Sequence, residues 1–298
     1  MNQPSRQQPQ TVLCVHDLSG IGKCSLTVAL PILSCMGIPV AALPTAILST
    51  HTGGFDGYTY RDLTDDMPAI AAHWRALSVP FGGIYSGWLG SARQSEIVLS
   101  LFDWFQKPET LVFVDPVMGD HGKLYSTFSP DRVAGIRALC QRADVISPNL
   151  TEACFLLGVP YPDPFVTRDQ ARTLCAALSE LGPRKVVITG LSTEKDRIGA
   201  AAWDARPQQF SLCQSPRVPG VWHGTGDIFA SVLLGFLSRN HSLPAATAEA
   251  VSFVHQCIES TYERGADPRF GVDFELHLKT LMEATTNGRE KNESQKSE

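Results

Sequence analysis

The sequence predicts an α/β protein in which a mostly parallel sheet is covered by helices on both faces. Short apolar runs rich in β-branched residues alternate with longer stretches of helical periodicity. The chain has 298 residues, of which 43% are hydrophobic, so it can bury a large core. Several apolar runs end in polar or glycine-rich turns, which in parallel sheets is the edge where ligands bind.

The elements follow one another along the chain as strand and helix candidates in turn. Strands are expected at Thr11–His16, Pro39–Leu43, Gly83–Ser86, Leu111–Asp115, Val145–Ser147 and Lys185–Thr189, and helices at Ser25–Met36, Asp65–Leu77, Ala92–Phe105, Arg132–Gln141, Leu150–Leu157 and Arg168–Leu181.

The alternation of strand and helix candidates ends near residue 198. Two short strand-like pieces, Ile198–Trp203 and Gln209–Cys213, predict an antiparallel hairpin at the edge of the sheet. Helices are then expected from Asp227 through Leu237, at Ala245–Tyr262 and at Phe274–Glu283. We expect residues 11–284 to form one domain, and the polar tails 1–10 and 285–298 to be disordered.

Composition argues against several classes of protein. The net charge is −5 and no Lys/Arg run is present, which disfavours nucleic acid as a partner. The apolar runs are too short for a signal peptide or a membrane span, so we expect a cytoplasmic protein with no membrane partner. The eight cysteines are scattered without a CxxC pair, which favours reduced thiols over a disulfide framework.

One glycine-rich turn leads directly into an apolar helix. Gly224-Thr225-Gly226-Asp227 precedes Ile228–Leu237. Glycines expose the backbone N–H groups of a turn, the helix directs its positive dipole end to the same place, and Asp227 lies in the first turn. Phosphoryl transfer to an alcohol needs such donors and a proton acceptor, although an isolated GxGD is more often only a helix start with an acidic residue.

Two acidic segments follow other predicted strands. Asp115 ends a buried strand pattern, where a carboxylate can hold Mg²⁺ through water, or can simply satisfy N–H groups of a turn. Glu152 follows Ser147-Pro148-Asn149 in the first turn of a helix, and capping alone explains it. Two acidic groups and an anion cradle at successive strand ends are harder to explain by capping.

The turn Gly20–Ser25 matches neither familiar nucleotide motif. A Walker A loop needs Gly in place of Asp17 and Ser or Thr in place of Cys24, and a dinucleotide fingerprint needs Gly in place of Ser25. The turn is therefore a glycine-rich connection in which Asp17 is either a cap or a substrate contact.

A polar, aromatic segment at Ser49–Tyr58 suits a small flap over a ring-shaped substrate. His51 and Thr52 are its candidate contacts, although a lone histidine is usually structural. Trp88 is a candidate to stack on a planar substrate, with ordinary packing as the alternative.

Taken together, these segments resemble the ribokinase-like superfamily, and within it the pyridoxal (vitamin B6) kinase group. The resemblance covers roughly residues 11–280. It implies a three-layer sandwich and a homodimer. The matching segments are Gly224–Asp227, Asp115–Asp120, Ser147–Glu152, His51–Gly53 and Val186–Gly190.

The resemblance also implies roles for individual residues at the transferred phosphoryl group. Asp227 would deprotonate the 5′-hydroxymethyl group of a B6 vitamer, and the N–H groups of Gly224, Thr225 and Gly226 would stabilise the moving phosphoryl. ATP would be the phosphate donor.

Further roles implied by the resemblance concern the metal, the nucleotide and the ring. Asp115 and Glu152 would organise Mg²⁺ and its waters. Asn149 and Thr189 would lie near the phosphates. Asp17 and Thr52 would bind ring substituents. Whether a monovalent cation assists stays open.

Two positions depart from the pyridoxal kinase pattern, so other substrates and functions stay open. Asp17 and Trp88 stand where many pyridoxal kinases carry Ser and Tyr, and hydroxymethylpyrimidine kinases commonly have Asp at the first position. Those kinases often carry Cys in place of Asp227, however. A hydroxymethylpyrimidine or dual-specificity kinase is therefore the first alternative, and an inactive B6- or nucleotide-binding sensor is the second.

Overall fold

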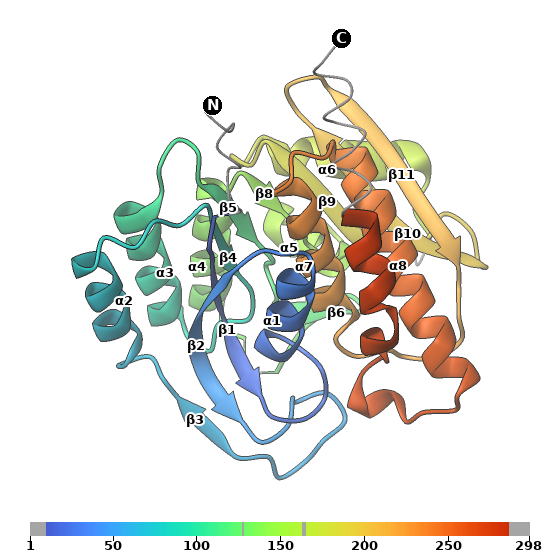
Figure 1. Cartoon of the computed structure of the whole chain (residues 1–298). Helices are drawn as coiled ribbons and strands as arrows, with labels where there is room; N and C mark the ends of the chain where they lie inside the picture. Colours follow the sequence, from blue (N-terminus) through green and yellow to red (C-terminus); the bar gives the residue numbers. More distant parts are fainter. Residues whose placement is uncertain (1–9, 127, 163–164, 286–298) are drawn as a thin grey trace, which may run out of the picture.

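A computed structural model of the protein describes residues 10–126, 128–162 and 165–285, and within them a nine-stranded sheet forms the middle layer (Figure 1). The strands are β1 (Val12–Ser19), β2 (Val40–Leu48), β3 (Tyr60–Asp62), β4 (Gly83–Ser86), β5 (Leu111–Val114), β8 (Val145–Ile146), β9 (Lys185–Leu191), β10 (Arg197–Asp204) and β11 (Gln209–Pro216).

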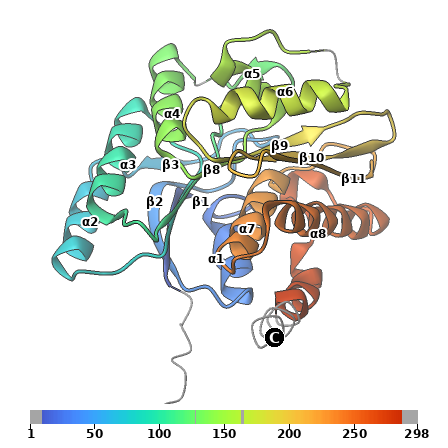
Figure 2. The same cartoon turned by 90° about the horizontal axis from the view of Figure 1, so that it is seen from above.

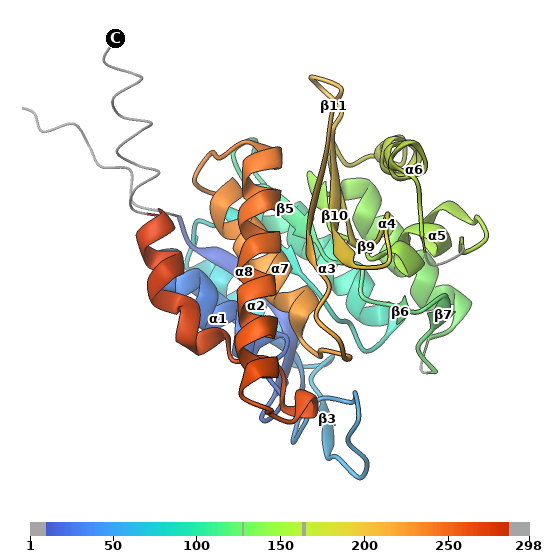
Figure 3. The same cartoon turned by 90° about the vertical axis from the view of Figure 1, so that its right-hand side faces the viewer.

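The strand order is β11-β10-β9-β8-β5-β4-β1-β2-β3. The strands from β9 to β2 pair in parallel, whereas β3, β10 and β11 pair antiparallel at the two ends of the sheet. Because the inner strands are parallel, their carboxyl ends meet at one edge, towards which the arrows of β1 and β2 point in Figure 1. Figure 3 shows the β10–β11 hairpin extending beyond the rest of the sheet.

Helices cover both faces of this sheet, so the molecule has three layers (Figure 2). One outer layer contains α1 (Leu26–Cys35), α7 (Thr225–Leu237) and α8 (Leu243–Glu263), and the other contains α2 (Met67–Ala76), α3 (Ala92–Phe105), α4 (Pro130–Arg142), α5 (Leu150–Leu157) and α6 (Arg168–Ser179).

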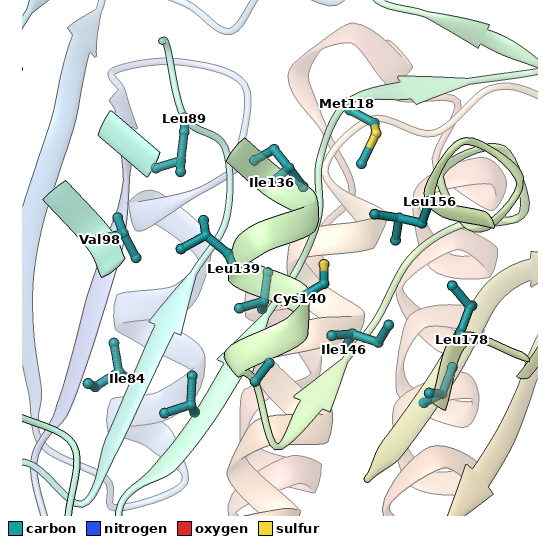
Figure 4. Packing of buried hydrophobic residues seen from close by; sticks show 14 of the residues in the cluster. Ile84, Leu89, Val98, Met118, Ile136, Leu139, Cys140, Ile146, Leu156 and Leu178 are labelled. Carbon is teal, nitrogen blue, oxygen red and sulfur yellow. The ribbon is translucent and has the colours of Figure 1, made fainter. Parts of the chain in front are cut away.

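Alternating side chains of the inner strands supply two separate hydrophobic cores. In β1, Leu13 and Val15 belong to the core under α2–α6, whereas Val12 and Cys14 belong to the core under α1, α7 and α8. Figure 4 shows the first core, where Leu139 of α4 lies among side chains of the strands and neighbouring helices. Burial of each large aliphatic side chain contributes about 1.5–3 kcal/mol, so the two cores hold the three layers together.

The expected three-layer α/β fold is confirmed, including the antiparallel hairpin at the edge. Strand β2 is longer than expected because it continues through Pro44, which lacks an N–H group. The pairing of β1 with β2 shifts just after His16, the residue that faces Pro44, and this irregularity accommodates the proline.

Three short strands and one helix boundary differ from expectation. The sequence does not predict strand β3 or the small hairpin of β6 (Gly119–Asp120) and β7 (Lys123–Leu124), because two or three residues are too few to show a periodic pattern. The last expected helix, Phe274–Glu283, begins as a 3₁₀ turn, η2 (Phe274–His277), and is helical at 278–285. A second 3₁₀ turn, η1 (Pro268–Phe270), precedes it.

The predicted tails fall almost entirely outside the described residues, and the single-domain assignment for 11–284 stays a prediction. Among the residues that the structure describes, no helix combines the length and apolar character that crossing a membrane requires.

Candidate active site

The carboxyl edge of the parallel strands gathers most of the residues singled out in the sequence. Asp17 lies in β1, Asp115 directly follows β5, and Thr189 lies in β9. Helices α7 and α5 both begin at this edge, so their positive dipole ends face the same region. The site is therefore formed by residues that are far apart in the sequence.

The start of α7 forms the anion cradle that the sequence predicts. Gly224, the residue before the helix, has a φ of 75°, and a Cβ added there would lie 2.0 Å from the carbonyl oxygen of Lys23. A Cβ on Gly226 would meet no atom within 4 Å, so this side of the turn is open. The Thr225 hydroxyl donates a hydrogen bond to the carbonyl of Trp222 at 3.1 Å. Since the first N–H groups of a helix lack intrahelical partners, an incoming anion can bind them.

Asp227 lies in the first turn of α7 and is partly accessible to solvent. Burial raises the pKa of its carboxyl group to about 7, the backbone N–H of Ser25 donates to it and lowers the pKa, and the charge of Asp17 raises the pKa. A carboxylate with a pKa near neutrality is a suitable acceptor for a hydroxyl proton.

Two hydroxyl groups hold Asp17 in place near Asp227. The Asp17 carboxylate accepts hydrogen bonds from Ser19 at 2.8 Å and from Ser25 at 2.5 Å. Burial raises the pKa of Asp17, while these hydrogen bonds and the nearby His51 lower it. The group is therefore a rigid hydrogen-bond acceptor near both Asp227 and the flap. No sequence pattern points to Ser19 or Ser25, because their contacts with Asp17 depend on the turn that follows β1.

The acidic pair lies where β5 and α5 meet the site. Glu152 accepts hydrogen bonds from the backbone N–H of Met118 at 3.0 Å and of Asn149 at 2.8 Å, so the capping interpretation of Glu152 is confirmed. Asp115 accepts a hydrogen bond from Ser147 at 3.2 Å.

Burial makes the ionised forms of Asp115 and Glu152 costly, so a cation that neutralises their charge would bind favourably. Burial raises the pKa of Glu152 to about 8. Burial, followed by the charges of Glu152 and Asp227, raises the pKa of Asp115 well above its ordinary value. No cluster of three or more His, Cys, Asp or Glu residues suited to a metal occurs in the described chain. Two carboxylates fit Mg²⁺, which keeps most of its waters and uses few protein ligands.

Asn149 and Thr189 are brought together beside the acidic pair. They form an isolated parallel bridge, and the N–H of Thr189 donates to the carbonyl of Pro148 at 2.9 Å. The Asn149 side chain accepts from the N–H of Glu152 at 2.9 Å and donates to the carbonyl of Gly119 at 2.8 Å. Asn149 therefore organises α5 and the β6–β7 hairpin, while the Thr189 side chain is half-buried.

The flap residues differ in their surroundings. His51 is buried, its Nε2 lies 2.7 Å from the carbonyl oxygen of Arg269, and its Nδ1 accepts from the N–H of Gly53 at 2.9 Å. Both ring nitrogens are therefore used within the protein. Thr52 is exposed. His223, which the sequence analysis did not single out, has its ring 5.2 Å from that of His51, between the flap and the cradle.

Trp88 is half-buried just beyond β4. Its ring lies edge-on to Tyr60 of β3 at a centroid distance of 6.5 Å, and the guanidinium of Arg132 lies 5.9 Å from it. These contacts fix the ring at the margin of the site.

A separate cavity of about 450 Å³ lies between α8 and the β10–β11 hairpin. Its lining includes Cys213, Gln214 and Ser252 but none of the site residues named above. Cys213 therefore faces this cavity rather than the cradle.

Comparisons with known proteins agree with this geometry. Residues 40–270 match the phosphomethylpyrimidine kinase family. A phosphomethylpyrimidine kinase structure from Bacteroides thetaiotaomicron, in a crystal form with pyridoxal, is 41% identical, covers 91% of this chain and 95% of that one, and gives a TM-score of 0.87. Pyridoxal kinase from Lactobacillus plantarum is 36% identical, with 93% and 98% coverage and a TM-score of 0.85.

A curated pyridoxal kinase from Rubrobacter xylanophilus is 29% identical, over 86% of this chain and 89% of its own length. The family match covers more than half of the chain, and the structural matches agree in fold over nearly all of it. The protein therefore belongs to the phosphomethylpyrimidine kinase family, within the ribokinase-like superfamily.

Proposed function

We propose that this kinase transfers the γ-phosphoryl group of ATP to the 5′-hydroxymethyl group of a B6 vitamer. The observation that carries the proposal is the partly exposed Asp227 carboxyl group, with a pKa of about 7, beside the open N–H groups at the start of α7. The choice of vitamer as substrate is supported by the relatives named as pyridoxal kinases.

The reaction is an in-line displacement at phosphorus. Asp227 accepts the hydroxyl proton, the hydroxyl oxygen forms a bond to the γ-phosphorus, and the bond from that phosphorus to the β–γ bridging oxygen breaks to release ADP. The N–H groups of Gly224, Thr225 and Gly226 stabilise charge on the moving phosphoryl oxygens. Asp17 and Thr52 would bind ring substituents, and Trp88 would border the ring.

The acidic pair and its neighbours would serve the nucleotide. Asp115 and Glu152 would hold Mg²⁺ through its waters, and the ion would neutralise phosphate charge. Asn149 and Thr189 would lie near the phosphates. For His51 we propose a positioning role in the flap, because both ring nitrogens already have partners.

A hydroxymethylpyrimidine kinase is the second candidate, favoured by the family match and by Asp17. The test is a coupled ADP-release assay with pyridoxal, pyridoxine, pyridoxamine and hydroxymethylpyrimidine, each with and without K⁺ and after removal of Mg²⁺ by EDTA. We expect Mg²⁺-dependent turnover of at least one vitamer with a higher kcat/KM than the pyrimidine. Turnover of the pyrimidine alone would replace the proposal, and no turnover of any alcohol would favour a sensor.

The setting of the reaction is also a proposal. We place it in the cytoplasm, where ATP is available and where the eight cysteines, all free in the structure, stay reduced. We propose a homodimer, which light scattering of the purified protein tests directly.

A further inference from the structure

The glycine-rich turn between β1 and α1 makes contacts that take no direct part in phosphoryl transfer. Lys23 and Ser25 in this turn have φ values of 48° and 51°, in the left-handed region that disfavours side chains. Such conformations cost free energy and persist where surrounding contacts hold them. The turn therefore needs an external restraint.

The restraint is an ion-pair cluster with the segment that follows η1. The ammonium group of Lys23 lies 2.9 Å from Asp273 and 2.9 Å from Glu275. The Lys23 side chain is only 27% exposed, and its ammonium lies 5.9 Å from the ring centroid of Phe274. Burial opposes the charge, but hydrogen bonds to the two carboxylates outweigh it and raise the pKa of Lys23. The ammonium is thus engaged within the protein, unlike a lysine that awaits a phosphate.

Two glycines, Gly224 and Gly271, pack closely against Lys23. A Cβ on Gly224 would lie 2.0 Å from the Lys23 carbonyl oxygen, and a Cβ on Gly271 would lie 2.7 Å from the Lys23 Cβ. Both glycines have positive φ, 75° and 84°. Lys23 therefore packs the β1–α1 turn tightly between the start of α7 and the segment that carries Asp273 and Glu275.

The turn, held in this way, contacts two of the acidic groups of the site, Asp17 and Asp227. The Ser25 hydroxyl donates to Asp17 at 2.5 Å, and the Ser25 backbone N–H donates to Asp227. A shift of Lys23 would displace Ser25, two residues along, and would release the contact with Gly224. The cradle and the base would then lose their shared support.

We propose that Lys23 is a positioning residue of the kinase reaction: its ion pairs with Asp273 and Glu275 hold the turn that fixes Gly224, the N–H groups of the cradle and the Asp227 carboxylate. This inference rests on the proposed function for its kinetic consequence. Donors that contact the moving phosphoryl group act mainly in the transition state, so misplacing them lowers kcat more than it raises KM.

The test replaces Lys23 while keeping its apolar stem. Lys23→Met should lower kcat about tenfold and change the vitamer KM less than about twofold, since a displaced donor loses part of the 10²–10³-fold effect of a deleted one. Lys23→Arg should restore most of kcat. The control is Lys279→Met, which removes an exposed lysine paired at 3.9 Å with Glu283 and should leave both constants unchanged.

A double-mutant cycle identifies the partners. In an Asp273→Asn/Glu275→Gln background, Lys23→Met should cause less than about a twofold further loss of kcat, because the ion pairs are already absent. If Lys23→Met does not fold, Glu275→Gln alone, which removes one ion pair, should still lower kcat selectively. An unchanged kcat in the soluble variants, or equal losses of Lys23→Met in both backgrounds, would overturn the proposal.

Amide hydrogen exchange separates this inference from the proposed function. The amides of Thr27 and Ile228, which donate to the carbonyls of Cys24 and Gly224 at 3.1 Å each, should exchange faster in Lys23→Met than in the wild type and in Lys279→Met, whichever alcohol is the substrate. Unchanged exchange there would count against the positioning role. Absence of wild-type turnover with every vitamer would instead count against the vitamer proposal, while the exchange result would still decide the structural half of the inference.

Discussion

Asp227 is a half-buried carboxyl group that borders an open anion cradle, and burial raises its pKa to about 7. Asp227→Asn keeps the shape but removes the proton acceptor. We expect kcat to fall on the order of 10²-fold or more, with vitamer binding retained. Steady-state kinetics and a binding titration check this, with Asp169→Asn on the exposed start of α6 as the control. A variant with wild-type kcat would show that another group accepts the proton.

The same pKa predicts how activity depends on pH. Below about pH 7 the Asp227 carboxyl group of the free enzyme is protonated and cannot accept the hydroxyl proton. The value of kcat/KM should therefore rise as the pH passes through about 7 and then level off. A profile from pH 5.5 to 8.5 measures this, and a flat profile across that range would contradict the assignment.

The sequence identified those single residues whose chemistry follows from a local motif. Asp227 and the cradle could be predicted because glycines, helix start and carboxylate are adjacent in the chain. The role of Ser25 in holding Asp17, and the ion pairs of Lys23 with Asp273, depend on residues that meet only in the folded chain. No single-sequence pattern reports such contacts.

The start of α5 joins stability to function within one element. Asn149 and Glu152 form a reciprocal capping box, and Asn149 also donates to the carbonyl of Gly119. Asn149→Ala should lower the free energy of unfolding by about 1 kcal/mol and should also raise the KM for ATP, because Glu152 loses the geometry set by the cap. Thermal denaturation and ATP kinetics measure the two effects.

Helix α6 supplies the matched control for that prediction. Thr167 and Gln170 form the same kind of capping box away from the site. Thr167→Ala should therefore lower stability by a similar amount and leave the KM for ATP unchanged. Equal effects of both variants on KM would mean that the start of α5 has no special part in nucleotide binding.

Elements with a long apolar period were predictable, and short polar ones were not. Residues 228–237 of α7 and strands β4 and β8 are fully buried apolar runs, whose composition indicates burial on its own. Strand β3 is three exposed residues, and it exists because β2 offers a free edge. The length of β2 was not predictable for a different reason. A proline such as Pro44 normally ends a strand, but here the pairing register of the neighbouring strand β1 shifts next to it, and β2 continues.

For the whole molecule, the carboxyl edge of the sheet concentrates acidic groups that folding buries. Parallel strands bring Asp17 and Asp115 to one edge, the start of α7 adds Asp227 there, and burial raises the pKa of each. Such an arrangement serves catalysis and costs stability at neutral pH, because the folded state must hold charge where water is scarce.

This cost predicts a pH-dependent gain in stability for Asp227→Asn. The carboxyl group has a pKa of about 7 when folded and 3.8 as its ordinary value, so between these the folded state binds the proton more strongly. Its contribution to stability is fully present below about pH 4 and is lost as the pH rises through 7. Asn carries no proton to lose, so the Tm of the variant relative to wild type should increase from pH 5 to pH 8.

The comparison must be a difference between variants, because other groups titrate over the same range. Burial lowers the pKa of His16 to about 3, which by itself makes stability rise between pH 3 and 6.5. That effect is common to wild type and Asp227→Asn and cancels in their difference. Thermal unfolding at pH 5, 6, 7 and 8 provides the data, with Asp169→Asn as an exposed control whose Tm difference should stay constant. A constant difference for Asp227→Asn as well would mean that this carboxyl group is solvated in the folded protein, and the pH profile expected for catalysis would then fail with it.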